Sequence, residues 1–112
     1  MKVAFDQIGH ISATFAADSG EAGQVCKMAG NGKVAPCGAG EEFIGVMEGI
    51  RKGCCAVQLH GFAELAYSGS APALGYAELV ADGNGGVKTG TGGRTCLVVS
   101  VDTNAMMAIV EL

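Results

Sequence analysis

Two short apolar runs between Gly40 and Gly61 constrain the fold of this chain more than any other feature. A charged link of three residues, Arg51-Lys52-Gly53, joins the two runs. The side chains of the second run alternate, with Cys55, Val57 and Leu59 on one side and Ala56, Gln58 and His60 on the other. A period of two is typical of a half-buried strand, so the stretch predicts a β-hairpin. Gly45 interrupts the first run, which indicates that a neighbouring group packs closely against it.

The rest of the chain repeats this pattern of short extended runs separated by glycine. Glycine makes up 19 of the 112 residues, against an average of about 7%, and it lacks the period of three of collagen. Further strands are predicted over residues 11–17, 24–29, 33–35, 62–67, 76–81, 87–89, 95–101 and 105–112. The run 95–101 places Leu97, Val99 and Val101 on one face. No stretch carries a long helical stripe, and the length predicts a single domain.

An internal repeat relates the two halves of the chain. Gly30-Asn31-Gly32-Lys33-Val34 resembles Gly83-Asn84-Gly85-Gly86-Val87, and each copy follows a short strand that opens with glycine. Asn-Gly between short extended runs is a strong hairpin signal. The repeat predicts one β unit used twice, with the units closing on each other. The expected fold is therefore all-β, a small pseudo-symmetric β-barrel or sandwich of short strands with an N-terminal arm.

Charge and hydropathy exclude several classes of function. The formal net charge is -4 and lysine and arginine do not cluster, so we expect no nucleic-acid partner, since phosphate contacts need clustered positive charge. No apolar run reaches the ~18 residues that a membrane-spanning helix needs, so we expect no membrane partner. The first residues lack the apolar core of a signal peptide, which favours synthesis in a cytoplasm without export.

The cysteines and histidines predict no catalytic or metal site. Cysteines stand at positions 26, 37, 54, 55 and 96. This odd number without a zinc-ligand spacing indicates small buried side chains rather than disulfides or a metal centre. His10 and His60 are the only histidines. An enzyme that pairs His60 with a cysteine stays open as an alternative, although no local signature links the two. We expect no enzymatic activity and no cofactor.

Two further motifs suggest other chemistry. The glycine-rich stretch 83–95 invites comparison with a phosphate-binding loop, but it carries Arg94 where that loop needs lysine, and a predicted strand follows where a helix should begin. Cys26-Lys27-Met28 is similar to the turn of biotin carrier domains. In those domains the lysine stands at a hairpin tip, whereas here the predicted tip is Asn31-Gly32. A β-barrel ligand-binding domain or a biotinyl- or lipoyl-like carrier domain remains the alternative function, and intact mass after expression with the ligase would decide it.

Several short motifs together resemble a family. They are a Phe-Ile-Gly-Val strand at 43–46, the segment Gly53-Cys54-Cys55-Ala56-Val57-Gln58-Leu59-His60-Gly61, and the turn Asp82-Gly83-Asn84-Gly85-Gly86-Val87. With the glycine-led strands, they make residues 20–112 similar to the small capsid decoration, or cement, proteins of tailed bacteriophages. Leu59 replaces a valine of the family pattern, and the turn is one residue longer. None of the motifs is catalytic.

The resemblance implies a structural role on a virus particle. It implies a β domain over residues 20–112 that forms a homotrimer, binds the major capsid protein on the outside of the head and stabilises the lattice. Residues 1–19, expected to hold an N-terminal arm and the first strand, match less well. Their apolar side chains Val3, Phe5 and Ile8 are the candidate contacts to the capsid or to a neighbouring subunit. The expected location is the capsid surface of the virion, after synthesis in the bacterial host.

Overall fold

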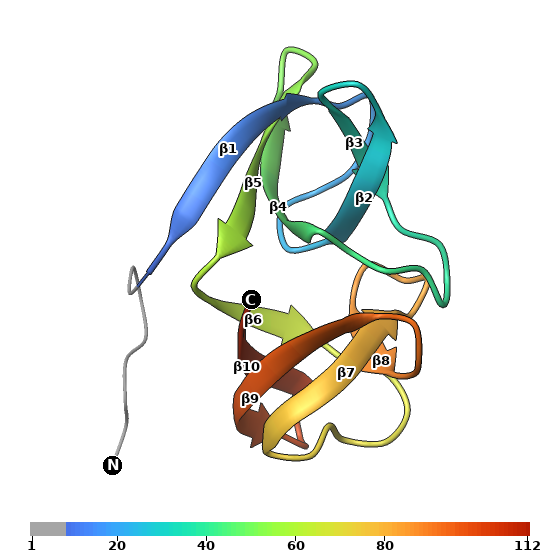
Figure 1. The fold of residues 1–112 in the computed structure, drawn as a ribbon, viewed down its shortest axis with the longest axis vertical. Helices are drawn as coiled ribbons and strands as arrows, with labels where there is room; N and C mark the ends of the chain where they lie inside the picture. The colour runs from blue at the N-terminus through green and yellow to red at the C-terminus, as the bar shows by residue number, and fades with distance from the viewer. Residues whose placement is uncertain (1–8) are drawn as a thin grey trace.

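The computed structural model describes residues 9–112, which form ten β-strands and no helix (Figure 1). The strands are β1 (Ile11–Ala16), β2 (Val25–Gly30), β3 (Lys33–Pro36), β4 (Gly45–Arg51), β5 (Cys54–His60), β6 (Phe62–Ala66), β7 (Gly75–Ala81), β8 (Val87–Thr89), β9 (Arg94–Asp102) and β10 (Met107–Glu111). The all-β prediction is confirmed. Every run predicted to be a strand overlaps an observed one, because period and turn chemistry are local properties of the sequence.

The two halves of the chain share one strand connectivity. The first sheet is a closed barrel in the order β1-β3-β2-β4-β5, with β5 returning to β1. The second has the order β6-β10-β9-β7-β8, and a parallel bridge between Tyr67 and Val87 links its two ends. A parallel pair, Ala16 with Lys33, makes the corresponding link in the first barrel. The predicted repeat is therefore visible in the topology (Figure 1). The second sheet is closed only by this one bridge, and we call it the second barrel.

The central hairpin is present as predicted. Strands β4 and β5 pair antiparallel, and Lys52 and Gly53 at its tip have positive φ angles of 53° and 76°. Two successive residues with positive φ suit the right-handed twist of the flanking strands. Gly45 is crowded, as expected: a Cβ atom there would overlap the carbonyl oxygen of Gln58 and would lie 2.9 Å from Cγ1 of Val57.

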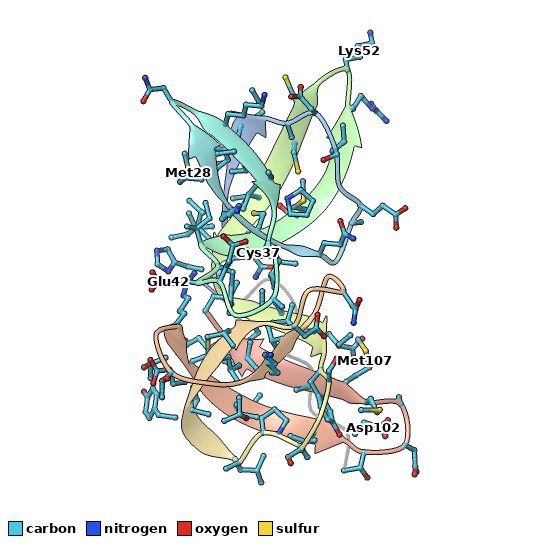
Figure 2. The ribbon with its side chains drawn as sticks, turned by 90° about the vertical axis from the view of Figure 1, so that its right-hand side faces the viewer. Met28, Cys37, Glu42, Lys52, Asp102 and Met107 are labelled. Carbon is cyan, nitrogen blue, oxygen red and sulfur yellow. The ribbon has the colours of Figure 1, made fainter. Side chains whose placement is uncertain are left out.

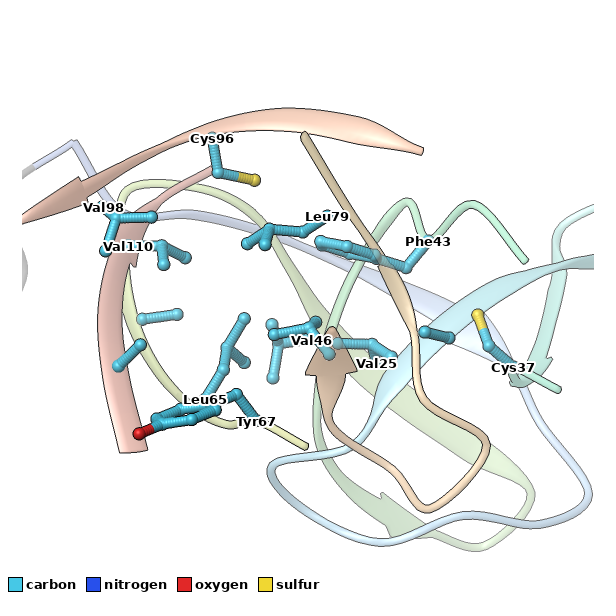
Figure 3. Packing of buried hydrophobic residues seen from close by; sticks show 14 residues of the cluster. Val25, Cys37, Phe43, Val46, Leu65, Tyr67, Leu79, Cys96, Val98 and Val110 are labelled. Carbon is cyan, nitrogen blue, oxygen red and sulfur yellow. The ribbon is translucent and has the colours of Figure 1, made fainter. Parts of the chain in front are cut away.

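The hydrophobic core has two parts. The interior of the first barrel holds a small cluster of six buried residues, Ala17, Cys26, Val34, Met47, Cys55 and Val57. The larger cluster fills the second barrel and continues to the first, which contributes Val25, Cys37, Phe43 and Val46. Figure 3 shows the ring of Phe43 beside Leu79. Full burial of such a side chain stabilises a fold by about 1.5–3 kcal/mol, so the shared cluster joins the two barrels energetically.

The side chains of strand β9 do not point to the sides that the sequence predicted. Its register against β10 shifts between Ile109 and Val110, so Val99 is the extra residue of a β-bulge. Before the bulge, Cys96 and Val98 face the core, and after it Val101 packs against the same core. The predicted common face of Leu97, Val99 and Val101 is therefore wrong, because a bulge changes the side on which later side chains fall.

Only part of the predicted N-terminal region, residues 1–19, lies within the described residues. Strand β1 pairs with β5 over its whole length, so residues 11–16 are an integral part of the first barrel. The candidate contacts Val3, Phe5 and Ile8 lie outside the described residues.

Candidate functional site

Arg94 connects the two barrels through its side chain. It begins β9 in the second barrel, and its guanidinium donates from Nη1 to the carbonyl oxygen of Ile44 and from Nη2 to that of Leu59, the latter at 3.0 Å. Both carbonyls belong to the first barrel. A guanidinium keeps its charge and presents five donors in a fixed plane, so one side chain can bind two strand ends. Arg94, which stands where a phosphate-binding loop would need lysine, therefore makes structural hydrogen bonds to the first barrel.

Gln58 is the buried polar residue at the same junction. Its side chain is 6% exposed, and Nε2 donates to the carbonyl oxygens of His60 and Phe62 at 3.2 and 3.0 Å. These contacts surround Gly61, where the chain bends with φ +105° between β5 and β6. The sequence placed Gln58 on the polar side of its strand. On that side Ala56 is half-buried and His60 is exposed, so only Gln58 is buried. Its amide is satisfied by the backbone carbonyls at the bend into the second barrel.

Backbone hydrogen bonds complete the junction between the barrels. Gly40 donates to the carbonyl oxygen of Ala81 at 2.8 Å, and Ala81 donates to that of Glu41 at 2.9 Å. Val25 donates to Gly85 at 3.0 Å. Each bond joins a residue of the first half to one of the second, so the loop before β4 is fixed by hydrogen bonds to the end of β7. These bonds and the shared core cluster make the junction a packed interface.

A polar cluster on the first barrel was not foreseen from the sequence. Nε2 of His10 lies 2.9 Å from Oγ of Ser12 and 3.1 Å from Oε2 of Glu48, while Ser12 donates to Oε1 of Glu48 at 2.5 Å. Because the serine proton goes to the carboxylate, Nε2 must donate to both oxygens. A catalytic triad uses the two imidazole nitrogens for two different partners. The cluster therefore contains the residue types of a hydrolase triad, but its histidine does not use one ring nitrogen for the serine and the other for the carboxylate.

The glycine loop after β8 already binds an anion from its own chain. The backbone N–H groups of Gly92 and Gly93 donate to Oε2 of Glu78 at 2.9 and 3.1 Å. A phosphate-binding loop would need such donors to be free. The intramolecular carboxylate explains the run of glycines as a turn shaped around Glu78.

Lys27 lies within β2 rather than at the hairpin tip, as the sequence predicted. Its ammonium donates to both carboxylate oxygens of Glu41, at 2.9 and 2.7 Å. This hydrogen bond raises the pKa of Lys27, and together with the bond from Gly38 it lowers the pKa of Glu41. A carrier lysine has to be reached by its ligase at an exposed turn, and Lys27 is instead held in an ion pair along the strand.

The cysteines divide by burial. Cys26, Cys37, Cys55 and Cys96 are buried and Cys54 is exposed, so the adjacent pair points to opposite faces of β5 as predicted. Burial raises the pKa of the Cys26 thiol to about 12 and that of Cys37 to about 11. High pKa values leave little thiolate, which is the reactive form. All five thiols are free, and the described residues include no group of three or more side chains that could hold a metal ion.

His60 does not meet a cysteine. It is exposed at the end of β5, whereas Cys54, the exposed thiol, begins the same strand. Six residues of extended chain separate the two by about 20 Å. The geometry therefore does not bring together His60 and the exposed cysteine.

Large apolar side chains are exposed on the second barrel. Leu74 is 70% exposed and Tyr76 is 76% exposed, and Tyr76 stands opposite the half-buried Leu97 of β9. We call Leu74, Tyr76 and Leu97 the β7 patch. Figure 2 shows the basic hairpin tip at Lys52 at the opposite end of the molecule from the turn at Asp102 in the second barrel. The patch therefore lies on the barrel remote from that charged tip.

Two comparisons of the chain with known proteins return no match. No model of a known protein family matches it, and a search of curated proteins finds no match. Within residues 9–112, no helix is of the length and hydropathy needed to cross a bilayer.

Proposed function

We propose that the chain is a structural protein of a tailed bacteriophage, a decoration protein that binds the outside of the head lattice as a homotrimer and stabilises it. The support from sequence is the set of glycine-led strand motifs over residues 20–112. The support from the fold is a double barrel whose junction is filled by packed side chains and backbone hydrogen bonds. Such a molecule offers outer surfaces for assembly, which suits a particle component.

The observation that carries the proposal is the β7 patch. Surfaces that join subunits are enriched in tyrosine and other large apolar residues and depleted of charge at their centre. Leu74 directly precedes β7, Tyr76 is the second residue of that strand, and Leu97 is the neighbour of Tyr76 on β9. A side chain such as tyrosine buries on the order of 150–250 Å² when a partner covers it. Burial of this patch between copies would therefore stabilise a trimer.

Light scattering after size-exclusion chromatography tests self-association. We expect a mass three times that of the 11.2 kDa chain. The double variant Leu74→Ser/Tyr76→Ser should shift the protein to the monomer while its circular dichroism spectrum stays unchanged, since both side chains are exposed. Met28→Ser is the matched control, because Met28 is exposed on the first barrel. A wild-type protein that stays monomeric at high concentration contradicts the trimer.

Attachment to the capsid is tested separately. We expect the protein to co-sediment with expanded phage heads that lack their decoration protein. Deletion of residues 2–9 should leave the domain folded in a circular dichroism melt but weaken trimer or capsid attachment. A sharper variant replaces Val3, Phe5 and Ile8 by serine, with Lys2→Ser/Asp6→Ser as the matched control. An apolar segment can bind by adding a strand to a partner's sheet edge, where apolar side chains become buried.

The results of these experiments test the N-terminal segment, the trimer and the attachment to the capsid separately. If the truncated protein unfolds, the segment belongs to the core of its own domain. If it folds, trimerises and binds heads as before, the segment has no role in attachment. A trimer that binds no phage head keeps the β7 patch as a subunit interface and rejects the role on the virion.

A further inference from the structure

An open hollow lies between the loop that joins β6 to β7 and the short strand β8. Its volume is ≈ 470 Å³, and it is lined by Ser68, Gly69, Ser70, Ala71, Ala73, Lys88 and Thr89. The start of the loop is fixed against β8, because Tyr67 forms a bridge with Val87 and Ser68 donates to the carbonyl oxygen of Val87 at 2.9 Å. The buried Pro72 fixes its middle. The hollow is thus a feature of the barrel wall.

Lys88 gives this hollow a positive charge that no acid in the described chain neutralises. Two other lysines, Lys27 and Lys33, are held in ion pairs with carboxylates, and Lys52 stands exposed at a hairpin tip. Lys88 is half-buried, and within residues 9–112 it has no ion pair. Since no carboxylate of residues 9–112 pairs with it, the ammonium of Lys88 can pair with an anion that enters the hollow.

Asp82 contacts Ser68, one of the residues that line the hollow, but its carboxylate already has hydrogen-bond donors of its own. Oδ2 of Asp82 accepts from the hydroxyl of Ser68 at 2.6 Å, and Oδ1 accepts from the backbone N–H groups of Asn84 and Gly86 at 2.7 and 3.1 Å. These bonds hold the carboxylate in the 82–86 turn. It is therefore occupied by donors of its own loop and leaves Lys88 available to an incoming ligand.

The other residues that line the hollow limit the kind of anion that could bind there. Ser70 and Thr89 are exposed, and their hydroxyl groups make no hydrogen bond to the described residues. The methyl groups of Ala71 and Ala73 form an apolar wall. One cation and two hydroxyls match a single negative charge, while the chain's net charge of -4 disfavours dianions such as phosphate.

We propose that this hollow binds a monocarboxylate that carries a small apolar body. Lys88 pairs with the carboxylate, Ser70 and Thr89 donate to its oxygens, and the alanine methyl groups contact the apolar part. The ligand is either a free acid or the C-terminal residue of a polypeptide, since both present the same carboxylate beside an apolar group. The inference stands independently of the proposed virion role, because it uses no residue of the β7 patch or of the N-terminal segment.

The test is a titration of the ¹⁵N-labelled protein followed by NMR. N-acetyl-leucine is the probe, and N-acetyl-leucinamide, which lacks the charge, is the matched control. We expect millimolar N-acetyl-leucine to shift the amide signals of Ser70, Lys88 and Thr89, and the amide to leave them in place. Lys88→Gln should weaken binding about tenfold or more, as loss of a charged hydrogen bond does. Lys52→Gln should leave it unchanged.

Every outcome of this titration bears on the proposal. Equal shifts with acid and amide would show that charge is not recognised, and equal weakening by both lysine variants would show only general attraction; either overturns the site. Absence of shifts at these signals overturns it as well. Isovalerate and an acetylated dipeptide ending in leucine then distinguish the sources, because a site for chain ends should prefer the dipeptide and a site for free acids should prefer isovalerate.

Discussion

Replacement of Arg94 by methionine tests how the two barrels are held together. The variant keeps an unbranched side chain of similar reach but loses both hydrogen bonds, to the carbonyl oxygens of Ile44 and Leu59. A hydrogen bond from a charged group contributes roughly 1.5–3 kcal/mol. Arg94 is only part-buried, so the lower value applies and both bonds together contribute about 3 kcal/mol. For a chain of this size that loss corresponds to a Tm lower by about 12 °C.

The assay is unfolding in guanidinium chloride, monitored by one probe in each barrel. Tyr67 is 5% exposed and reports on the second barrel through its fluorescence. Labelling of the buried Cys26 by a thiol reagent, followed peptide by peptide with mass spectrometry, reports on the first barrel. We expect the two transitions to coincide in the wild type, because the larger core cluster joins the barrels. Arg51→Met is the matched control, since Arg51 is exposed near the hairpin tip. If Arg94→Met costs no more free energy of unfolding than Arg51→Met, the side chain does not hold the junction.

Further predictions concern packing, thiol reactivity and pH. Gly45→Ala should lower the free energy of unfolding by about 3 kcal/mol or more, since its Cβ would overlap a backbone carbonyl. Gly30→Ala is the control: a Cβ there would lie 3.9 Å from its nearest neighbour, so the free energy of unfolding should change by less than about 0.5 kcal/mol. Equal losses of stability in the two variants would refute the steric explanation. The folded protein should react with a thiol reagent once per chain, at Cys54; fast reaction of a second thiol counts against the packing. The pKa of Cys26 is about 12 in the folded protein, above its ordinary 9.0, so the unfolded chain loses this proton at lower pH. The free energy of unfolding therefore falls as the pH rises from 9 towards 12, by up to about 1.4 kcal/mol per pH unit. Chemical denaturation across that range should show a smaller slope in Cys26→Ala, and an unchanged slope excludes this thiol as the cause.

The sequence by itself determined the strands, the turns and the duplication. The alternation in 54–60, the Asn31-Gly32 tip and the crowding at Gly45 were all predictable, and the structure confirms them. These features depend on residues that are close along the chain, because side-chain period and positive φ angles are local properties. The repeat was visible for the same reason, since both units use the same turn signal before a valine.

Only the tertiary structure decided which faces are covered and which polar groups meet. Gln58 is buried at the bend where the chain passes from the first barrel to the second. The bulge at Val99 reverses the side on which later side chains fall, which a strict period of two would not predict. Arg94 contacts a carbonyl 50 residues away, and the cluster of His10 and Glu48 spans 38 residues. Contacts at such separations follow from how the barrels dock, and docking depends on the shape and burial of whole surfaces. Short sequence patterns do not encode those surfaces, so only the folded chain brings these side chains together.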